Sequence, residues 1–164
     1  MCEKYYLFKY NDELVNKYNN KNEIFNEYTY KYQKFSHYSY LIKRIVLFSV
    51  ITKGKYSVFC VYSPEKKLIH YSFIIPKCSK FTFMEKDDYQ IGPCWTSEEY
   101  RGKGVYGNVL NFICCELKKN NENSNIYVLI RKSNSSSIKG IEKANFEIVG
   151  YCKKNKFKKY SLER

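Results

Sequence analysis

Histidine, proline and glycine are scarce in this sequence. It has only two histidines, and its seven cysteines are irregularly spaced without a C-x-x-C pair, so the ligand spacing of a structural zinc site is missing. An odd, unpaired set of cysteines is typical of a reducing compartment. The three prolines and seven glycines form no linker, and no internal repeat is visible. These absences predict a single domain over residues 1–164 that holds no metal.

Long apolar runs are missing as well. Residues 1–9 lack the apolar segment that a secretory signal peptide carries. The longest apolar stretch, residues 41–51, is interrupted by Lys43 and Arg44 and is too short to span a bilayer. We therefore expect a cytoplasmic protein without a membrane partner.

Acidic residues are outnumbered, with 16 Asp and Glu against 29 Lys and Arg and a net charge of +13. A charge of this size attracts polyanions, but nucleic acid, an anionic membrane and a phosphate-rich cofactor would all satisfy it. A solvated basic surface is the simpler interpretation, because the lysines are scattered or lie in the tail at residues 153–159. Hydrophobic residues make up 44% of the chain and aromatic residues 18%, which argues against intrinsic disorder.

Hydrophobic patterns predict an alternation of strands and helices in the second half of the chain. Residues 12–38 suggest one or two short helices, and residues 41–51 are ambiguous, with β-branched side chains that favour a strand. Strands are predicted at residues 4–9, 56–62, 68–75, 89–96, 126–130, 146–151 and 157–162, and helices at 105–119 and 135–144, the latter with Asn134 as N-cap. Residues 63–67 have the composition of a hairpin turn. The strand–helix–strand unit over residues 89–130 predicts two parallel strands in an α/β or α+β sheet.

The loop between residues 96 and 105 combines features that bind anions. Gly102, Gly104 and Gly107 permit backbone conformations and close approaches that side chains prevent. The loop opens the predicted helix at 105–119, where unpaired N–H groups and the helix dipole favour phosphate. Arg101 and Lys103 add positive charge. The spacing fits neither a Walker loop nor the dinucleotide-binding pattern, and an ordinary helix-starting turn is the alternative.

Two segments carry a resemblance to a known family. Residues 101–107 resemble the Arg/Gln-x-x-Gly-x-Gly/Ala signature of GNAT acetyltransferases, and residues 92–100 look like the fourth strand of that family running into its pyrophosphate loop. Residues 134–146 resemble the second family signature, an Asn followed by a small residue and a helix that ends in Gly-Phe. In this chain Asn145 stands at the position of that Gly. The resemblance covers residues 56–151.

The resemblance implies an α+β (mixed α/β) fold. Its centre would be a twisted, mostly antiparallel sheet of about six or seven strands, flanked by about four helices. A splayed parallel strand pair would mark the cofactor site. Residues 1–55 would form a variable N-terminal part, residues 56–151 the cofactor-binding core and residues 152–164 a basic C-terminal strand.

The same resemblance implies acetyl-coenzyme A as the cofactor. Main-chain groups of the fourth strand would contact pantetheine, the glycine loop would hold the pyrophosphate, and the second signature would bind from the far side. The residues expected to bind are Cys94, Trp95, Thr96, Arg101, Gly102, Lys103, Gly104, Val105, Tyr106, Gly107, Asn134, Ser137 and Lys139.

Catalytic residues are less clearly marked. Tyr106 replaces the last Gly or Ala of the loop signature, Ile141 stands where many family members have a Tyr that acts as general acid, and Gln90 is the nearest match to a frequent Glu base. His70 is the candidate base, since an ordinary imidazole pKa near 6.5 suits neutral pH, although a lone strand histidine is more often a packed or surface residue. A covalent role for Cys94 is the less favoured option.

The expected activity is direct transfer of an acetyl group to a primary amine. The segments look like members found with surface-polysaccharide biosynthesis, which implies an amino sugar, nucleotide-linked or not, or another small amine as the acceptor. The alternatives are a protein or peptide N-acetyltransferase and a non-catalytic module that binds acyl-CoA or nucleic acid. Lysines and aromatics interleave at residues 28–35 as in single-strand binding, but one face of a core helix explains them equally, and no nucleic-acid partner is expected. A homodimer is an option because family members often dimerise.

Overall fold

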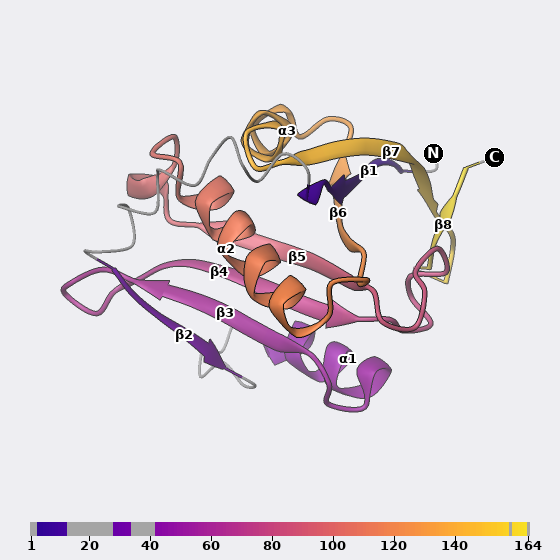
Figure 1. Cartoon of the computed structure of the whole chain (residues 1–164), viewed down its shortest axis with the longest axis horizontal. Helices are drawn as coiled ribbons and strands as arrows, with labels where there is room; N and C mark the ends of the chain where they lie inside the picture. Colours follow the sequence, from indigo (N-terminus) through magenta and orange to yellow (C-terminus); the bar gives the residue numbers. More distant parts are fainter. Residues whose placement is uncertain (1–2, 13–27, 34–41, 158, 164) are drawn as a thin grey trace.

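The protein, seen here in a computed structural model, is built on one mixed sheet (Figure 1); the structure describes residues 3–12, 28–33, 42–157 and 159–163. In these residues the sheet has eight strands in the order β2-β3-β4-β5-β6-β1-β7-β8. The strands are β1 (Lys4–Tyr10), β2 (Thr29–Gln33), β3 (Ser57–Tyr62), β4 (Leu68–Pro76), β5 (Tyr89–Thr96), β6 (Ile126–Arg131), β7 (Phe146–Lys154) and β8 (Tyr160–Leu162). The helices are α1 (Ile42–Thr52), α2 (Val105–Asn120) and α3 (Ser135–Glu142), with a short 3-10 turn at Glu98–Tyr100. The predicted mixed α/β class is confirmed, and the described residues contain eight strands and three α-helices, where six or seven strands and about four helices were expected.

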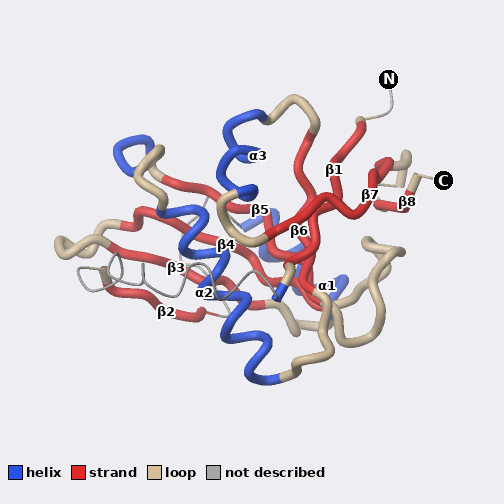
Figure 2. Tube along the Cα trace, turned by 45° about the horizontal axis from the view of Figure 1, so that its top comes forward, coloured by secondary structure: helices blue, strands red, loops and turns tan. Residues whose placement is uncertain are grey.

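All neighbouring strands run antiparallel except β5 and β6, which α2 connects. These two pair in parallel only over Tyr89–Ile91 and Ile126–Val128. Beyond that point β6 continues to pair with β1, while β5 stays with β4. The predicted splayed parallel pair is therefore present. Figures 1 and 2 show the result, with β6, β1, β7 and β8 set to one side of β2–β5.

The sheet buries a separate apolar cluster on each face. On one face the apolar side of α2, including Val109 and Ile113, packs on strand residues such as Ile91. On the other face Phe48 of α1 packs with Phe73 of β4 in a cluster rich in aromatic rings. The two faces are covered by different helices, so the face on which a strand residue lies decides which helix it meets.

Residues 41–51 were expected to favour a strand, and this prediction is wrong: Ile42–Thr52 is α1. Phe48, Ile51 and Thr52 turn inward, and the Thr52 hydroxyl donates to the Phe48 carbonyl at 2.6 Å. Gly54, with φ of 74°, ends the helix through a hydrogen bond from its N–H to the Ser49 carbonyl. Tertiary packing of one helical face and a glycine stop outweigh the β propensity of the branched residues.

The helices expected within residues 12–38 are also wrong where the structure describes this region. Thr29–Gln33 is β2, an edge strand antiparallel to β3. The Tyr30 ring stacks on Phe59 with centroids 5.7 Å apart and also contacts Phe112 of α2. Residues 13–27 and 34–38 lie outside the described residues.

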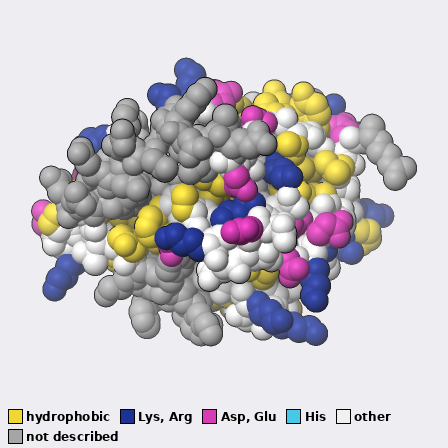
Figure 3. All heavy atoms as spheres, in the orientation of Figure 1, with side chains coloured by type: hydrophobic (Ala, Val, Ile, Leu, Met, Phe, Trp, Pro, Cys, Tyr) yellow, Lys and Arg dark blue, Asp and Glu magenta, His cyan; other side chains and the backbone are white. Residues whose placement is uncertain are grey.

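Charges are mixed on the face of the molecule drawn in Figure 3. Lys and Arg side chains there are interspersed with Asp and Glu side chains. Within the described ranges, none of the helices has both the length and the apolar character that crossing a membrane requires.

Candidate functional site

An irregularity in β5 decides which side chains reach the α2 face. Opposite β4, Ser72 pairs with Cys94 but Ile74 pairs with Ile91, so β5 carries one extra residue at Gly92-Pro93. Gly92 adopts φ of 125°, a conformation that L side chains rarely take. A bulge of this kind shifts the alternation of the strand by one. As a result Cys94 packs in the same cluster as Ile91, under α2.

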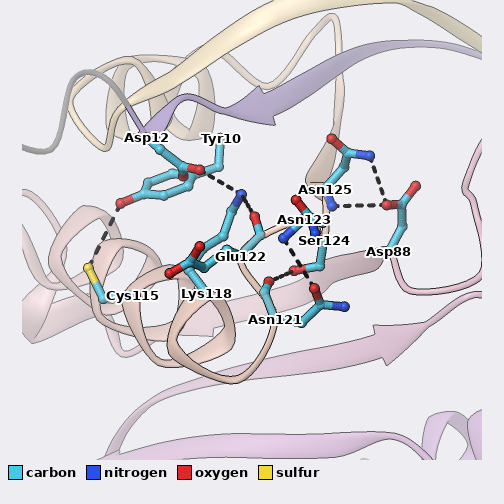
Figure 4. A network of polar contacts seen from close by, with 10 residues as sticks. All are labelled: Tyr10, Asp12, Asp88, Cys115, Lys118, Asn121, Glu122, Asn123, Ser124 and Asn125. Carbon is cyan, nitrogen blue, oxygen red and sulfur yellow. Dashed lines mark hydrogen bonds and ion pairs between the residues drawn. The ribbon is translucent and has the colours of Figure 1, made fainter.

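The two parallel strands are joined at their starts by a buried carboxylate. Asp88 is 2% exposed, and its oxygens accept hydrogen bonds from Glu85 N at 2.7 Å and from Asn125 N and Nδ2 at 2.9 Å each. Tyr89 N donates to Asn125 O at 2.9 Å. Figure 4 shows Asp88 and Asn125 facing each other across this junction. The clamp fixes β5 to β6 directly before the point where they separate.

The far end of α2 is anchored to the end of β1. Lys118 Nζ forms an ion pair with Asp12 at 2.6 Å and donates to the Glu122 carbonyl at 2.8 Å (Figure 4). The Tyr10 hydroxyl lies 3.9 Å from Cys115 Sγ. These contacts hold the helix axis in place and leave its opposite end, at Val105, to face the loop from β5.

The loop from β5 to α2 is exposed from Arg101 to Gly104. Arg101 Nε donates to the Thr96 carbonyl at 3.2 Å, and its guanidinium pairs with Glu98 at 3.2 Å. Lys103 Nζ lies 5.2 Å from the centroid of the Tyr100 ring. Both cations are therefore at the surface of the predicted anion loop and are held by neighbours within it.

Gly104 forms the start of α2. It is the N-cap residue, in the left-handed conformation with φ of 80° and ψ of −4°. Asn108 N donates to Gly104 O at 3.1 Å, so the N–H groups before Asn108 point out of the helix start without an intrahelical partner. Gly102 also has a positive φ, of 75°, and a Cβ added there would meet no atom within 4 Å. Unpaired N–H groups, a positive helix end and open space together suit an anion.

Two residues of the loop signature are used for packing against α3. A Cβ added at Gly140 would lie 2.8 Å from Cδ1 of Tyr106, so the Tyr106 ring rests on α3. A Cβ added at Gly107 would lie 3.2 Å from Gly140 O, so Gly107 lets the two helices approach. Burial, together with the neighbouring Cys94, raises the pKa of Tyr106 well above its usual range. Val105 is buried in the core below α2.

The second signature caps and packs α3. Asn134 is its N-cap, as predicted, and Asn134 Oδ1 accepts from Ser137 N at 3.2 Å and from Ser136 Oγ at 3.0 Å. A ligand contact from this side chain would therefore come from Nδ2. Lys139 is exposed on α3, whereas Ile141 is completely buried in the α2-side core. The Ile141 side chain is a hydrocarbon, so it cannot act as a general acid, and it packs in the core.

His70 belongs to a continuous chain of hydrogen bonds on the α2 face. His70 Nδ1 lies 2.8 Å from Thr96 Oγ1, and His70 Nε2 lies 2.8 Å from Ser72 Oγ. Ser72 Oγ donates to Cys94 Sγ at 3.1 Å. Because the Ser72 proton is used on sulfur, Ser72 accepts from Nε2–H, and Nδ1 accepts from Thr96. Every donor in the chain therefore points toward Cys94. The Tyr106 ring lies over it, with its centroid 6.3 Å from that of His70.

Burial shifts the pKa of two members of this hydrogen-bond chain, His70 and Cys94. His70 is 0% exposed, and its burial lowers its pKa to about 3. Burial raises the pKa of Cys94 to about 12, while the Ser72 hydrogen bond acts in the opposite direction. At neutral pH the imidazole is uncharged and the thiol is protonated. No amine could contact His70 directly, because both ring nitrogens are occupied.

The structure thus brings most of the predicted residues to the region where β5 leaves β6. Cys94, Thr96 and His70 lie under the start of α2, whereas Trp95 faces the other side of the sheet and stacks on Tyr71 at 5.7 Å. Ser72 was missed, although its spacing of two from His70 places both on one face of a strand. The six cysteines in the described part of the chain are free thiols, and no group of three His, Cys, Asp or Glu there could hold a metal.

Comparison with known proteins identifies the fold. Neither a family model nor a curated protein matches the sequence. A GNAT-family acetyltransferase from Colwellia psychrerythraea matches the structure with a TM-score of 0.58 at 13% identity, over 91% of this chain and 53% of that one. A protein described as a GNAT-family acetyltransferase from Novosphingobium aromaticivorans matches with a TM-score of 0.56 at 11% identity, over 92% and 62%.

A third solved structure covers both chains more evenly. AAC(6')-Ib, in complex with paromomycin and acetyl-CoA, gives a TM-score of 0.58 at 14% identity, over 84% of this chain and 91% of that one. This chain spans less than two thirds of the length of the first two proteins. At these identities the likeness shows that the chain has the GNAT fold.

Proposed function

We propose that this chain is an acetyl-CoA-dependent N-acetyltransferase that transfers the acetyl group directly to a primary amine. The observation that carries the proposal is the separation of β5 from β6 after Ile91, next to a glycine loop and the start of α2. Beyond Ile91 none of the described strands pairs with β5 on its β6 side, so this part of β5 borders the gap, and the loop adds an anion site at its end. An extended ligand with a diphosphate at one end, such as coenzyme A, fits this combination.

Several residues would hold the cofactor. N–H groups from Gly102 to Gly107 and the start of α2 would bind its phosphates, with Arg101, Lys103 and Lys139 adding charge. Main-chain groups of Cys94, Trp95 and Thr96 would bind pantetheine. Asn134 Nδ2 and Ser137 would act from α3, whose start carries both residues. Acetyl-CoA, when bound, supplies the acetyl group as a reactive thioester.

His70 is proposed to act indirectly. Any proton that reaches it must pass through Thr96 or Ser72, because these hydroxyls occupy both ring nitrogens. With a pKa of about 3, a proton on His70 at pH 7 costs about 5 kcal/mol. His70 would therefore relay a proton transiently and would not store one. Holding acetyl-CoA and the amine in the correct orientation would supply most of the rate enhancement.

The proposed acceptor is a small primary amine, with an amino sugar, nucleotide-linked or not, as the first candidate. The net charge of +13 suits an anionic, diphosphate-bearing substrate. AAC(6')-Ib, which shares the fold, binds paromomycin, a molecule with several primary amines. Acidic peptides are the second acceptor class. Thiol release from acetyl-CoA, measured with amino sugars, UDP-linked amino sugars and acidic peptides in parallel, separates the two classes.

Nucleic-acid binding receives less support. The Tyr28 ring packs edge-on against Tyr100 with centroids 6.2 Å apart, and Tyr30 stacks on Phe59. Both rings therefore already pack against other aromatic rings of the protein, although Tyr30 is 43% exposed. A protein that binds RNA would in any case show strong salt dependence and no response to acetyl-CoA.

The first test is a thermal-shift titration with acetyl-CoA, using CoA and ATP as controls. At a concentration 100 times the dissociation constant, a ligand stabilises its protein by about 2.7 kcal/mol. For a domain of this size the melting temperature should rise by about 5–10 °C. A folded, ligand-free sample that responds to ATP as strongly as to acetyl-CoA, or to neither, contradicts the proposal.

A further inference from the structure

Gln90 carries an unpartnered polar atom beside the strand separation. The residue is 5% exposed, and its Nε2 donates to the Ile91 carbonyl at 2.7 Å. This bond fixes the orientation of the amide, since the reverse orientation would place two oxygens together. Gln90 Oε1 then has no hydrogen-bond partner among the described residues. A buried acceptor in this state is costly, and each such atom in a folded protein calls for an explanation.

The amide extends along β5 toward the region where the strands separate. Gln90 occupies the middle of the three positions that β5 pairs with β6, opposite Tyr127. Its Nε2 would lie 3.1 Å from a Cβ at Gly92, so only the glycine leaves room for the amide there. Gly92 is the first residue of β5 beyond the paired segment. The amide that carries the unpartnered oxygen is thus held beside the start of the separation, by its hydrogen bond to Ile91 and by the space that Gly92 leaves for Nε2.

The surroundings offer this oxygen little else to bind. Ile75 is the partner of Gln90 on β4, and both Ile75 and Tyr127 belong to the apolar and aromatic cluster on the α1 face. This face is opposite to that of His70, Ser72 and Thr96. A ligand atom entering between β5 and β6 could meet an acceptor on one face of β5 and the hydroxyl chain on the other.

Two other buried side-chain atoms lack a hydrogen-bond partner in the described residues, and both lie away from the strand separation. Tyr56 OH lies before β3, in the cluster with Phe48 and Phe73, and Asn111 Oδ1 lies within α2. Neither residue is on β5 or β6. Tyr56 therefore offers a matched control for the loss of an unpartnered atom away from the site.

We propose that Gln90 Oε1 accepts a hydrogen bond from the primary amine that this enzyme acetylates, and so positions that amine at the root of the strand separation. The inference rests on the proposed function. A neutral amide oxygen can bind either an amine or an ammonium group, but it takes no proton from them. Gln90 is therefore a substrate-positioning residue. The cost of the unpartnered oxygen in the free protein is relieved when the amine binds, which favours substrates with an N–H donor.

The first test uses Gln90→Met, which keeps the length of the side chain and removes the acceptor, and Tyr56→Phe as the control. Ethylamine, glucosamine and paromomycin serve as probes, titrated in the presence of CoA so that no turnover occurs. Loss of one hydrogen bond should weaken amine binding to Gln90→Met about fivefold to tenfold. Tyr56→Phe should bind amines as the unmodified protein does. Affinity for CoA should stay within about twofold in both variants, because the phosphate loop is untouched.

The second readout is direct. In ¹⁵N-labelled protein the side-chain NH₂ resonances of Gln90, assigned by their absence from Gln90→Met, should shift saturably with an amine, whereas those of Asn111 should not. No saturable shift with any of the three probes, or equal amine affinity in Gln90→Met, overturns the proposal and leaves the oxygen to a bound water. A thermal shift with acetyl-CoA in the same sample shows that this failure concerns Gln90 alone. Absence of that thermal shift as well refutes the proposed function.

Discussion

Replacing Asp88 by Ala should destabilise the protein strongly, because three hydrogen bonds converge on one buried carboxylate. The donors Glu85 N, Asn125 N and Asn125 Nδ2 lie 2.7, 2.9 and 2.9 Å from its oxygens. Hydrogen bonds to a charged group contribute about 1.5–3 kcal/mol each, but contributions at one site do not add fully, and water entering the gap recovers part of the loss. We expect the free energy of unfolding to fall by about 3–5 kcal/mol. That is a large share of the about 5–15 kcal/mol typical of a domain.

Urea denaturation followed by far-UV circular dichroism measures the effect. The midpoint of Asp88→Ala should fall while the slope of the transition stays unchanged, since the surface exposed on unfolding is the same. Asp88→Asn is the matched control. It keeps one acceptor oxygen for Asn125 but points an amide at Glu85 N, so its loss should lie about midway. Asp88→Ala within about 1 kcal/mol of the unmodified protein would refute the clamp argument.

The same variant links stability to the proposed site. Asp88 joins the starts of β5 and β6 just before the strands separate (Figure 4). Loosening this junction should widen the gap in which pantetheine is proposed to lie, so acetyl-CoA should stabilise Asp88→Ala less than the unmodified protein. An undiminished thermal shift would show that the clamp serves folding alone.

Three further predictions follow from the site. Gly140→Ala should lower the free energy of unfolding by about 1–3 kcal/mol, because the new Cβ would lie 2.8 Å from the Tyr106 ring. In a Tyr106→Ala background the same change should instead stabilise α3, since Ala has a higher helix propensity than Gly. Equal effects in both backgrounds would contradict the contact. Gly104→Trp should abolish the thermal shift with acetyl-CoA, since Gly104 is left-handed at the proposed phosphate site; a full shift in a folded variant would exclude that site. His70, with its pKa lowered to about 3, binds no proton in the folded protein near pH 5 but binds one when unfolded, so its contribution to stability falls as pH decreases from about 6.5 toward 3. Over this range the free energy of unfolding of the unmodified protein should therefore fall more steeply with decreasing pH than that of His70→Gln, by up to about 1.4 kcal/mol per pH unit. Urea denaturation at several pH values measures both slopes. Equal slopes for the two proteins would show that His70 is not buried as an uncharged group.

The sequence predicted the second half of the chain well because local and tertiary preferences agree there. Residues 89–96 were predicted as a strand and form β5, and the apolar spacing at 105–119 becomes α2 with one residue more. The Asn134 cap was also readable, since an Asn before a run of serines has a local reason to begin a helix. In this half each element carries its own signal.

The first half was harder because tertiary contacts decide its structure. Ile42–Thr52 has strand-like residues but buries Phe48 and Thr52 as a helix, and the stop signal at Gly54 was the only local hint. In β2 the tyrosine spacing fits a strand or a helix, and pairing with β3 resolves it. Sequence alone could not show that His70 is buried between two hydroxyls, since Thr96 comes from a different strand.

The extra residue in β5 explains why the site could not be read from alternation alone. In a regular strand Ile91 and Trp95 would share one face, and Cys94 and Thr96 would lie with Gln90 on the other. The bulge at Gly92-Pro93 reverses this order: Ile91 and Cys94 lie under α2, Thr96 reaches His70, and Trp95 joins the aromatic cluster on the α1 face. The same bulge places a glycine beside the Gln90 amide and ends the pairing with β6. One inserted residue therefore produces the hydroxyl chain on one face and leaves an unpartnered acceptor on the other, and both flank the gap in which we place the reaction.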